Sequence, residues 1–489
     1  MTRFLLLPLL PFVEVASSCS WQGPELEVTS EVINPDCIGL GVEWDPYDEV
    51  PAWGYEISEE DWRKLYSRLD AMRPSFVRCM INSPFLYYDS TDGTFHPERN
   101  SSSITRLLSY CQKNSIRVLF GEFNPPTWSM RESWEWIEYS VKYLNFLVEE
   151  KGFTCITDFI IYNEPDGDWA STNGDWGLYL RMLGRFRSEM DKYPALSDGK
   201  VSLCGPDVVL NYRNPASPYD DKGWVERSVQ DASDLISLYE IHAYPGQHEV
   251  RSGELASRLR EIVPLIPEGK KIVLGEAGFK YDNPDDTLLM EKHLGRVEEI
   301  PFTKGTDSNL LVYDYFYGLD MSLLAMECLN NGLGGLAVWM LDDAMHTKND
   351  SGVPEDLKIW GFWNILGEEA FGKADEEKVR PFYYTWSLMS RYFPRGCDIL
   401  KCNIPEGIPG INVLAASLGD EKSVCILNIS EESRSLSIRM QSPFENASQY
   451  LYTQREDYEN ISPVKTGING STIRAEIPPG SLILISDMR

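Results

Sequence analysis

The sequence has few residues of the types that build metal or phosphate sites. Its 489 residues include only five histidines, and its ten cysteines form no CxxC pair. Histidine and cysteine nowhere cluster at the spacing of metal ligands. No glycine-rich phosphate motif of the Rossmann or P-loop kind follows a predicted strand. We therefore predict no metal site and no cofactor.

An excess of basic charge is also missing. The formal net charge is −30 at pH 7, with 75 acidic residues against 45 lysines and arginines. Nucleic acids and anionic membrane surfaces both need basic patches, so neither is a predicted partner. The composition, 43% hydrophobic and 25% charged, is that of an ordinary globular protein. Its many tryptophans and tyrosines could stack on the apolar faces of a sugar, although most aromatic residues belong to cores.

Long apolar segments are absent, and the N-terminus alone holds a candidate targeting segment. Arg3 is followed by an apolar run over residues 4–13 and by small residues before Cys19. This order is typical of an export signal, and the run is too short to span a bilayer. We predict that residues 1–20 direct export to the periplasm or cell surface, or secretion. Cys19 resembles a lipoprotein cleavage site; whether it carries a lipid anchor, the one membrane contact considered, stays open.

Short apolar runs alternate with amphipathic stretches between residues 37 and 396. Eight strand-like runs can be placed, at 38–45, 76–81, 116–123, 159–164, 201–209, 235–244, 271–279 and 334–343. Alternation of strand and helix predicts an α/β fold, a (β/α)8 TIM barrel over residues 37–396. An aromatic helix over 380–395 would complete it.

The pattern changes after residue 397. Short alternating runs separated by turn clusters such as Pro478-Pro479-Gly480 predict an all-β sandwich over residues 397–489. Residues 26–33 alternate in the same way, so we predict that segment 21–36 adds an N-terminal strand to this domain. Cys397 and Cys402 could form a local disulfide, which the sequence does not decide.

Two predicted barrel strands carry a glutamate near their carboxyl ends. Glu164 follows Asn163 at the end of the fourth strand, and Glu276 lies in the seventh. Because the carboxyl ends of barrel strands meet at one rim, both side chains should face one pocket. A protonated carboxyl can donate to a leaving oxygen while an ionised one attacks the anomeric carbon. The pair therefore indicates glycoside cleavage.

With Asn163-Glu164 on strand four and Glu276 on strand seven, the chain resembles a retaining glycoside hydrolase of clan A. The resemblance implies that Glu164 is the acid/base and Glu276 the nucleophile. The barrel-plus-sandwich build is similar to the glucosylceramidase-like and β-xylosidase-like branches. Many cellulase-like members have a histidine at the end of strand three, where this chain has Gly121-Glu122-Phe123-Asn124.

Seven further residues are predicted to bind substrate or to support the two glutamates. The resemblance implies that Arg78 keeps the nucleophile ionised, that Asn163 holds the sugar 2-hydroxyl, and that Tyr244 bonds the nucleophile. Tryptophans at strand ends or in rim loops would form sugar platforms. The seven are Arg78, Asn163, His242, Tyr244, Trp339, Trp128 and Trp44, with Asp45 beside the last as a further candidate for the pocket floor.

The predicted function is hydrolysis of β-glycosidic bonds in a polysaccharide or oligosaccharide by double displacement, with exo action favoured. An endo-acting glycanase, a transglycosylase and a non-catalytic carbohydrate-binding protein on the same barrel are the alternatives. A metal-dependent barrel hydrolase would need clustered ligands that the sequence lacks. The identity of the sugar is not encoded in any motif found here.

Overall fold

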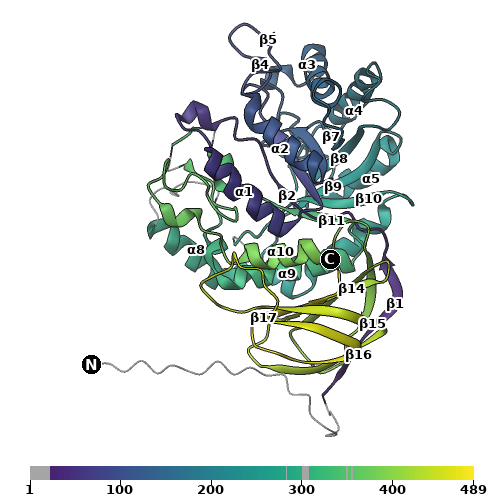
Figure 1. Ribbon diagram of the computed structural model, residues 1–489. Coiled ribbons are helices and arrows are strands. Elements are labelled where there is room, and N and C mark those ends of the chain that lie inside the picture. The colour runs from purple at the N-terminus through teal and green to yellow at the C-terminus, as the bar shows by residue number, and fades with distance from the viewer. Residues whose placement is uncertain (1–22, 282–283, 300–307, 349–350, 354–355, 489) are drawn as a thin grey trace.

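The computed structural model describes residues 23–281, 284–299, 308–348, 351–353 and 356–488 (Figure 1). It contains a closed barrel of eight parallel strands and a separate, mainly antiparallel sheet of seven strands. This arrangement confirms the predicted fold class. The predicted export segment, with Cys19, lies outside the described residues.

The barrel strands follow one another in chain order, and the last pairs with the first to close the barrel. They are β2 (Gly39–Glu43), β3 (Phe76–Ile81), β6 (Arg117–Glu122), β7 (Ile156–Ile160), β8 (Ser202–Val209), β9 (Ile236–Ala243), β10 (Lys271–Ala277) and β11 (Gly335–Val338). Strand β11 ends five residues earlier than the run 334–343 suggested. The chain then turns through Asp342, whose carboxylate accepts the backbone N–H of Ala344 and Ile365.

Helices cover the outside of the barrel. They are α1 (Glu59–Met72), α2 (Ser101–Lys113), α3 (Trp134–Asn145), α4 (Trp176–Met190), α5 (Asp221–Ala232), α6 (Gln247–Arg251), α7 (Glu254–Ile262), α8 (Thr287–Glu299), α9 (Tyr315–Asn330) and α10 (Phe382–Tyr392). Among the described residues, no helix is both long and apolar enough to cross a membrane.

A small apolar cluster fills the lower barrel interior. Its members come from successive strands and alternate with residues that face the helices, as the pleat requires. They include Phe76, Leu119, Ile160, Leu238 and Val273. Above this plug, polar side chains replace apolar ones toward the carboxyl ends of the strands, so the interior opens into a polar rim.

The seven-stranded sheet holds both ends of the described chain. Its strands are β1 (Glu25–Asn34), β12 (Asp398–Asn403), β13 (Ile411–Leu418), β14 (Glu421–Asn428), β15 (Arg434–Tyr452), β16 (Lys465–Ile477) and β17 (Ser481–Ser486). Strand β1 pairs antiparallel with β12 and parallel with β15, next to which it runs in Figure 1. The long strand β15 passes register shifts on both sides of Phe444 where it pairs with β16.

Helices α9 and α10 lie between the barrel and the sheet (Figure 1). Helix α9 is apolar on nearly all sides because both neighbours cover it. Asn330 at its end donates to the carbonyl of Val413, and Tyr452 of the sheet donates to the carbonyl of Tyr315. The described cysteines are free thiols, Cys397 and Cys402 among them.

Candidate active site

Glu164 and Glu276 come together at the carboxyl end of the barrel. Glu276 lies on β10 and is almost fully buried, and Glu164 lies in the loop after β7. One carboxyl oxygen of Glu164, one carboxyl oxygen of Glu276 and a ring nitrogen of His242 all lie within 4.8 Å of one another. Both glutamates line one cavity of about 410 Å³. Residues distant in the sequence thus present two carboxyl groups to a single small-molecule-sized space.

The backbone of Glu164 has an unusual conformation. Its φ of 47° lies in the left-handed region, which few non-glycine residues adopt. Its N–H donates to Asp207 at 3.1 Å, and its carbonyl accepts from Gly167 at 2.9 Å. The indole N–H of Trp169 donates to the carboxyl oxygen Oε2 of Glu164 at 2.6 Å. The loop therefore fixes both the backbone and the carboxyl group.

A β-bulge aims Glu276 at the cavity. On β10, Val273 faces the barrel interior, so strict alternation would turn Glu276 toward the helices. The register with β9 shifts between Leu274 and Glu276, which reverses this direction. Gly275 lies at the shift, and a Cβ there would be 1.5 Å from Glu240 Oε1. The absence of a side chain at Gly275 lets the strand pass this carboxylate.

Arg78 on β3 is the centre of a buried ionic network. One guanidinium nitrogen contacts both Glu276 and Glu43 at 2.7 Å, and Nε donates to Glu240 at 2.8 Å. The remaining nitrogen donates to Asn163 at 2.7 Å and lies 3.3 Å from Asp207. All five N–H donors of arginine are directed to oxygen acceptors, the geometry for which a guanidinium is suited.

His242 on β9 is a second buried cation in this network. Its Nε2 lies 2.6 Å from Asp207, and its Nδ1 lies 2.9 Å from Glu164 and 3.5 Å from Glu276. Burial opposes the charged form, but Glu276 and Asp207 outweigh it and raise the pKa of His242 well above its usual value. The imidazole is therefore held as a cation among the carboxyl groups of Glu276, Asp207 and Glu164.

Burial and the two cations act in opposite directions on the pKa values of the carboxyl groups around them. Burial raises the pKa of Glu276, but His242 and Arg78 outweigh this and lower it below its usual range. Glu43 contacts the same guanidinium nitrogen, yet burial dominates there and raises its pKa well above the usual value. The hydroxyl of Tyr244 donates a hydrogen bond to Glu276, which further stabilises the carboxylate. Glu276 is thus kept as an anion, the state a nucleophile needs.

Aromatic rings form the walls of the cavity. The rings of Tyr244, Trp339 and Trp360 meet edge to face, with centroids 5.3 to 6.4 Å apart. Trp169 also lines the cavity and packs against Tyr212 at 4.6 Å between ring centroids. Such rings offer flat apolar faces beside the two carboxyl groups.

The structure gathers most, but not all, of the predicted site residues. Asn163, Tyr244 and Trp339 line the cavity. Arg78 contacts Glu276, and His242 lies close to both Glu276 and Glu164.

Two predicted tryptophans lie elsewhere. Trp128 does not line the cavity and is 54% exposed on a short helix after β6. Trp44 is buried in the core against Tyr110 of α2, because alternation along β2 turns Glu43 inward and Trp44 outward. The neighbouring Asp45 carboxylate lies 2.6 Å from His346 Nε2 and does not line the cavity.

Several cavity residues had no signal in the sequence. The loop residues Trp169, Lys280, Lys358 and Trp360 follow strands at no fixed spacing. Asp207 could have been found as the one charged residue in the run 201–209, and Glu240 because it shares the face of His242 two residues later.

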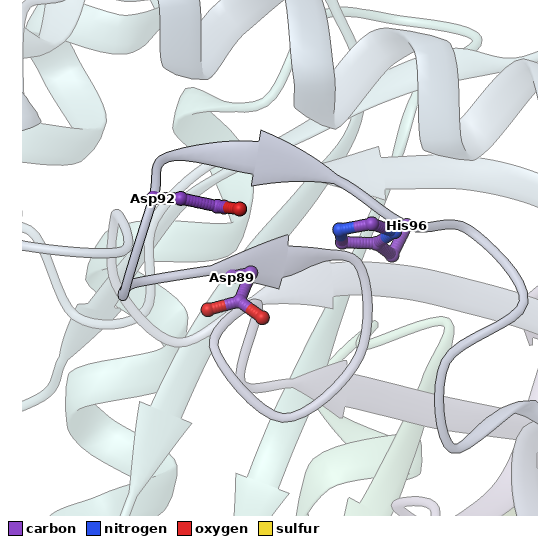
Figure 2. A group of neighbouring side chains, drawn as sticks. All are labelled: Asp89, Asp92 and His96. Carbon is purple, nitrogen blue, oxygen red and sulfur yellow. The ribbon is translucent and has the colours of Figure 1, made fainter.

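Two other clusters of polar groups lie away from this site. Asp89, Asp92 and His96 meet on the hairpin of β4 (Tyr88–Asp89) and β5 (Thr94–Phe95), shown in Figure 2. The hydroxyl of Thr94 bonds both Asp92 and His96, so this exposed turn is explained by its own hydrogen bonds. A cavity of about 540 Å³ beside the sheet contains Asp487, whose oxygens accept backbone N–H groups.

A parallel eight-stranded barrel joined to a β-sheet domain is also the fold of solved glycoside hydrolases of families 30 and 39. No protein-family model matches the sequence, and no curated protein matches it. Solved structures do match over nearly the whole chain, and this chain shares their fold.

Three of these structures illustrate the likeness. A GH30 endoxylanase from Clostridium papyrosolvens C71 has 13% identity and a TM-score of 0.58, covering 95% of this chain and 100% of its own. A GH39 β-xylosidase from Caulobacter crescentus has 11% identity and a TM-score of 0.60, with coverages of 95% and 99%. A conserved exported protein from Bacteroides fragilis has 12% identity and a TM-score of 0.63, with coverages of 94% and 100%. At such identities the likeness defines the fold and leaves the reaction to be argued from the site.

Proposed function

We propose that the protein is a retaining glycoside hydrolase that cleaves β-glycosidic bonds by double displacement. The observation that carries the proposal is the approach of Glu164 and Glu276 within 4.8 Å across one cavity. Carboxyl groups about 5 Å apart suit a covalent intermediate, whereas inversion needs roughly 6.5 Å or more to admit a water molecule. The fold likeness to hydrolases of families 30 and 39 is in keeping with this assignment.

In the first step, Glu276 attacks the anomeric carbon while Glu164 gives its proton to the leaving oxygen. Arg78, His242 and Tyr244 hold Glu276 as the carboxylate that this attack requires. In the second step, Glu164 takes a proton from water, the water oxygen attacks the anomeric carbon, and Glu276 departs as a free carboxylate. Two inversions leave the configuration of the sugar unchanged.

Asn163 has the position expected of a group that holds the sugar. Its side-chain oxygen accepts from Arg78, which leaves the amide N–H groups available to the cavity. A donor there can bind the 2-hydroxyl beside the nucleophile, a bond that strengthens as positive charge develops at the anomeric carbon. Trp339 would support the ring from below.

Exo action on a chain end is the mode we favour. The cavity of about 410 Å³ is near the lower end of ligand sites, and loops after three strands contribute its walls through Trp169, Tyr244 and Lys280. An exo enzyme releases single sugars from an oligosaccharide from the first turnover, whereas an endo enzyme releases shorter oligosaccharides. Chromatography of early products distinguishes the two modes.

The test of the reaction is covalent labelling. A panel of 2-deoxy-2-fluoro β-glycosides with good leaving groups should inactivate the enzyme and add one sugar to the peptide that contains Glu276. Proton NMR of early products should show the β anomer. A non-catalytic binding protein would stay unlabelled, and a transglycosylase would be labelled but give transfer products at high acceptor concentration. Appearance of the α anomer first would refute the retaining mechanism.

We also propose that the protein is exported. The support is the apolar N-terminal segment before Cys19 and the fold shared with a protein described as exported. Fractionation of the native host, with mass spectrometry of the mature N-terminus, tests both export and lipidation of Cys19.

A further inference from the structure

Two lysines share the cavity with the paired glutamates. Lys280 follows β10 and Lys358 follows β11, and both are among the residues that line it. The Nζ of Lys280 lies 5.0 Å from the centroid of the Tyr244 ring, and that of Lys358 lies 5.5 Å from the Trp339 ring. These rings are the ones next to Glu276, so both ammonium groups are near the sugar that would occupy the cavity.

Within the part of the chain that the structure describes, neither ammonium group has a carboxylate within salt-bridge distance. Two other lysines that lie over rings do have such a partner. Lys151 pairs with Glu98 at 2.8 Å, and Lys292 pairs with Asp314 at 2.7 Å. Lys142 and Lys270 also lie over rings and, among the described residues, have no carboxylate within salt-bridge distance. What distinguishes Lys280 and Lys358 is that both line the cavity with the two glutamates.

The carboxyl groups of the cavity do not neutralise these lysines. Glu276 is paired with Arg78, and Glu164 is bonded by Trp169 and His242. The lysine pair is thus a local positive site in a chain of net charge −30. Because physiological salt screens exposed charges beyond about 8 Å, a ligand inside the cavity senses the two nearby ammonium groups more than the distant surface.

We propose that the substrate of this site is an anionic glycan, whose sugar carries a carboxylate or a sulfate ester that Lys280 and Lys358 bind. The inference rests on the proposed glycosidase function. Lysine binds such groups as a flexible point charge through three N–H donors. A neutral sugar would leave both ammonium groups without a counter-charge in a partly buried cavity. The aromatic corner would then hold the ring while the lysines select for charge.

The experiment compares matched neutral and anionic substrates. The variants are Lys280→Gln, Lys358→Gln and the double variant, with Lys142→Gln as control. Lys142 also lies over a ring, with its Nζ 4.4 Å from the centroid of Phe95, but it belongs to the outer helix α3. Its substitution removes the same unit of charge. The substrates are aryl β-glucoside and β-glucuronide, aryl β-galactoside and β-galacturonide, and a 6-sulfated aryl β-galactoside.

For wild type we expect a higher kcat/KM on an anionic member than on its neutral partner. The ratio of the two should fall about tenfold for each lysine removed, as for loss of one charge-assisted hydrogen bond. It should also fall with rising ionic strength, and Lys142→Gln should keep the wild-type ratio. Preference for the uronides identifies a carboxylate, and preference for the sulfated galactoside identifies a sulfate ester. An unchanged ratio in the double variant, or a wild-type preference for neutral members, overturns the proposal.

A binding assay separates this inference from the reaction itself. Free glucuronate, galacturonate and galactose 6-sulfate are added to wild type and to the double variant, and the thermal unfolding midpoint is followed. Suppose that an anionic sugar raises the unfolding midpoint of wild type but not of the double variant, while turnover and labelling at Glu276 are both absent. That result would refute the glycosidase assignment and leave the anionic ligand in place. No lysine-dependent shift with any of the three acids, together with no anionic preference in turnover, refutes the anionic substrate.

Discussion

The Nδ1 atom of His242 lies 3.5 Å from Glu276 Oε2, so a buried imidazolium adjoins the carboxylate assigned as nucleophile. The histidine and Arg78 together keep Glu276 ionised, at the cost of burying several charges in one network. The charge state of this histidine is therefore tied to the pH range in which the site can react.

The first prediction concerns this pH range. Glu276 must be ionised to attack, and His242 lowers its pKa, so activity of the wild type should persist to pH values below the usual range of glutamate. In His242→Asn the nearby positive charge is lost, the pKa of Glu276 rises, and the acidic limb of kcat/KM should move to higher pH. The measurement is the pH profile of kcat/KM. His248→Asn, on the half-exposed helix α6, should leave the limb in place.

The second prediction uses azide to separate the roles of the two glutamates. Glu276→Gly and Glu164→Ala should each lose activity by about a thousandfold or more, because each removes a group that acts in the transition state. Azide should restore Glu276→Gly and give the α-glycosyl azide, since one displacement inverts the centre. With Glu164→Ala and an activated substrate, azide should give the β product. NMR of the products provides the measurement, and exchange of the two outcomes would mean that the roles are reversed.

The third prediction concerns Arg78 and stability. Arg78→Met leaves Glu43, Glu240, Asp207 and Glu276 in the barrel interior without the guanidinium. Removing one partner of a buried ionic network costs about 3–5 kcal/mol. Denaturant unfolding should show that loss. Arg439→Met is the control, because Arg439 pairs with Glu25 and Glu27 on the exposed face of the sheet and should change stability little.

The fourth prediction concerns the bulge in β10. Gly275→Ala places a Cβ against the carboxylate of Glu240, so Glu240 or the strand must move, and Arg78 loses alignment with Glu276. We expect lower kcat and a lower unfolding midpoint. Gly184→Ala in α4 meets nothing within 4 Å and should instead stabilise the fold by about 0.5–1 kcal/mol. A Gly275→Ala enzyme with wild-type kcat would contradict this account of the bulge.

The barrel and the positions of its strand ends could be predicted because buried parallel strands give short apolar runs, and their carboxyl ends must share one rim. Arg78, Asn163, His242 and Tyr244 were identified in this way from single strands. Trp44 illustrates the limit. A residue just past a strand end can face either side, and only the inward position of Glu43 fixes its direction.

The bulge at Gly275 marks a second limit. Strict alternation from Val273 would have turned Glu276 away from the interior, and the register shift that corrects this has no signature in the sequence apart from the glycine itself. Trp169, Lys280 and Lys358 lie in loops, where no periodicity relates position to direction. Charge selection in the cavity could therefore be inferred only from the arrangement in space.

Strand β1 joins β12 and β15 and is separated from them by the whole barrel in the sequence. On the ribosome this strand is made before the barrel, and its two neighbours are made after it. Its unpaired edges must stay out of wrong pairings until some 360 residues have followed, and closing so long a loop slows assembly. Completion of the sheet is thus a late event, and nascent chains that stall in the barrel would expose an incomplete β domain to aggregation or proteolysis.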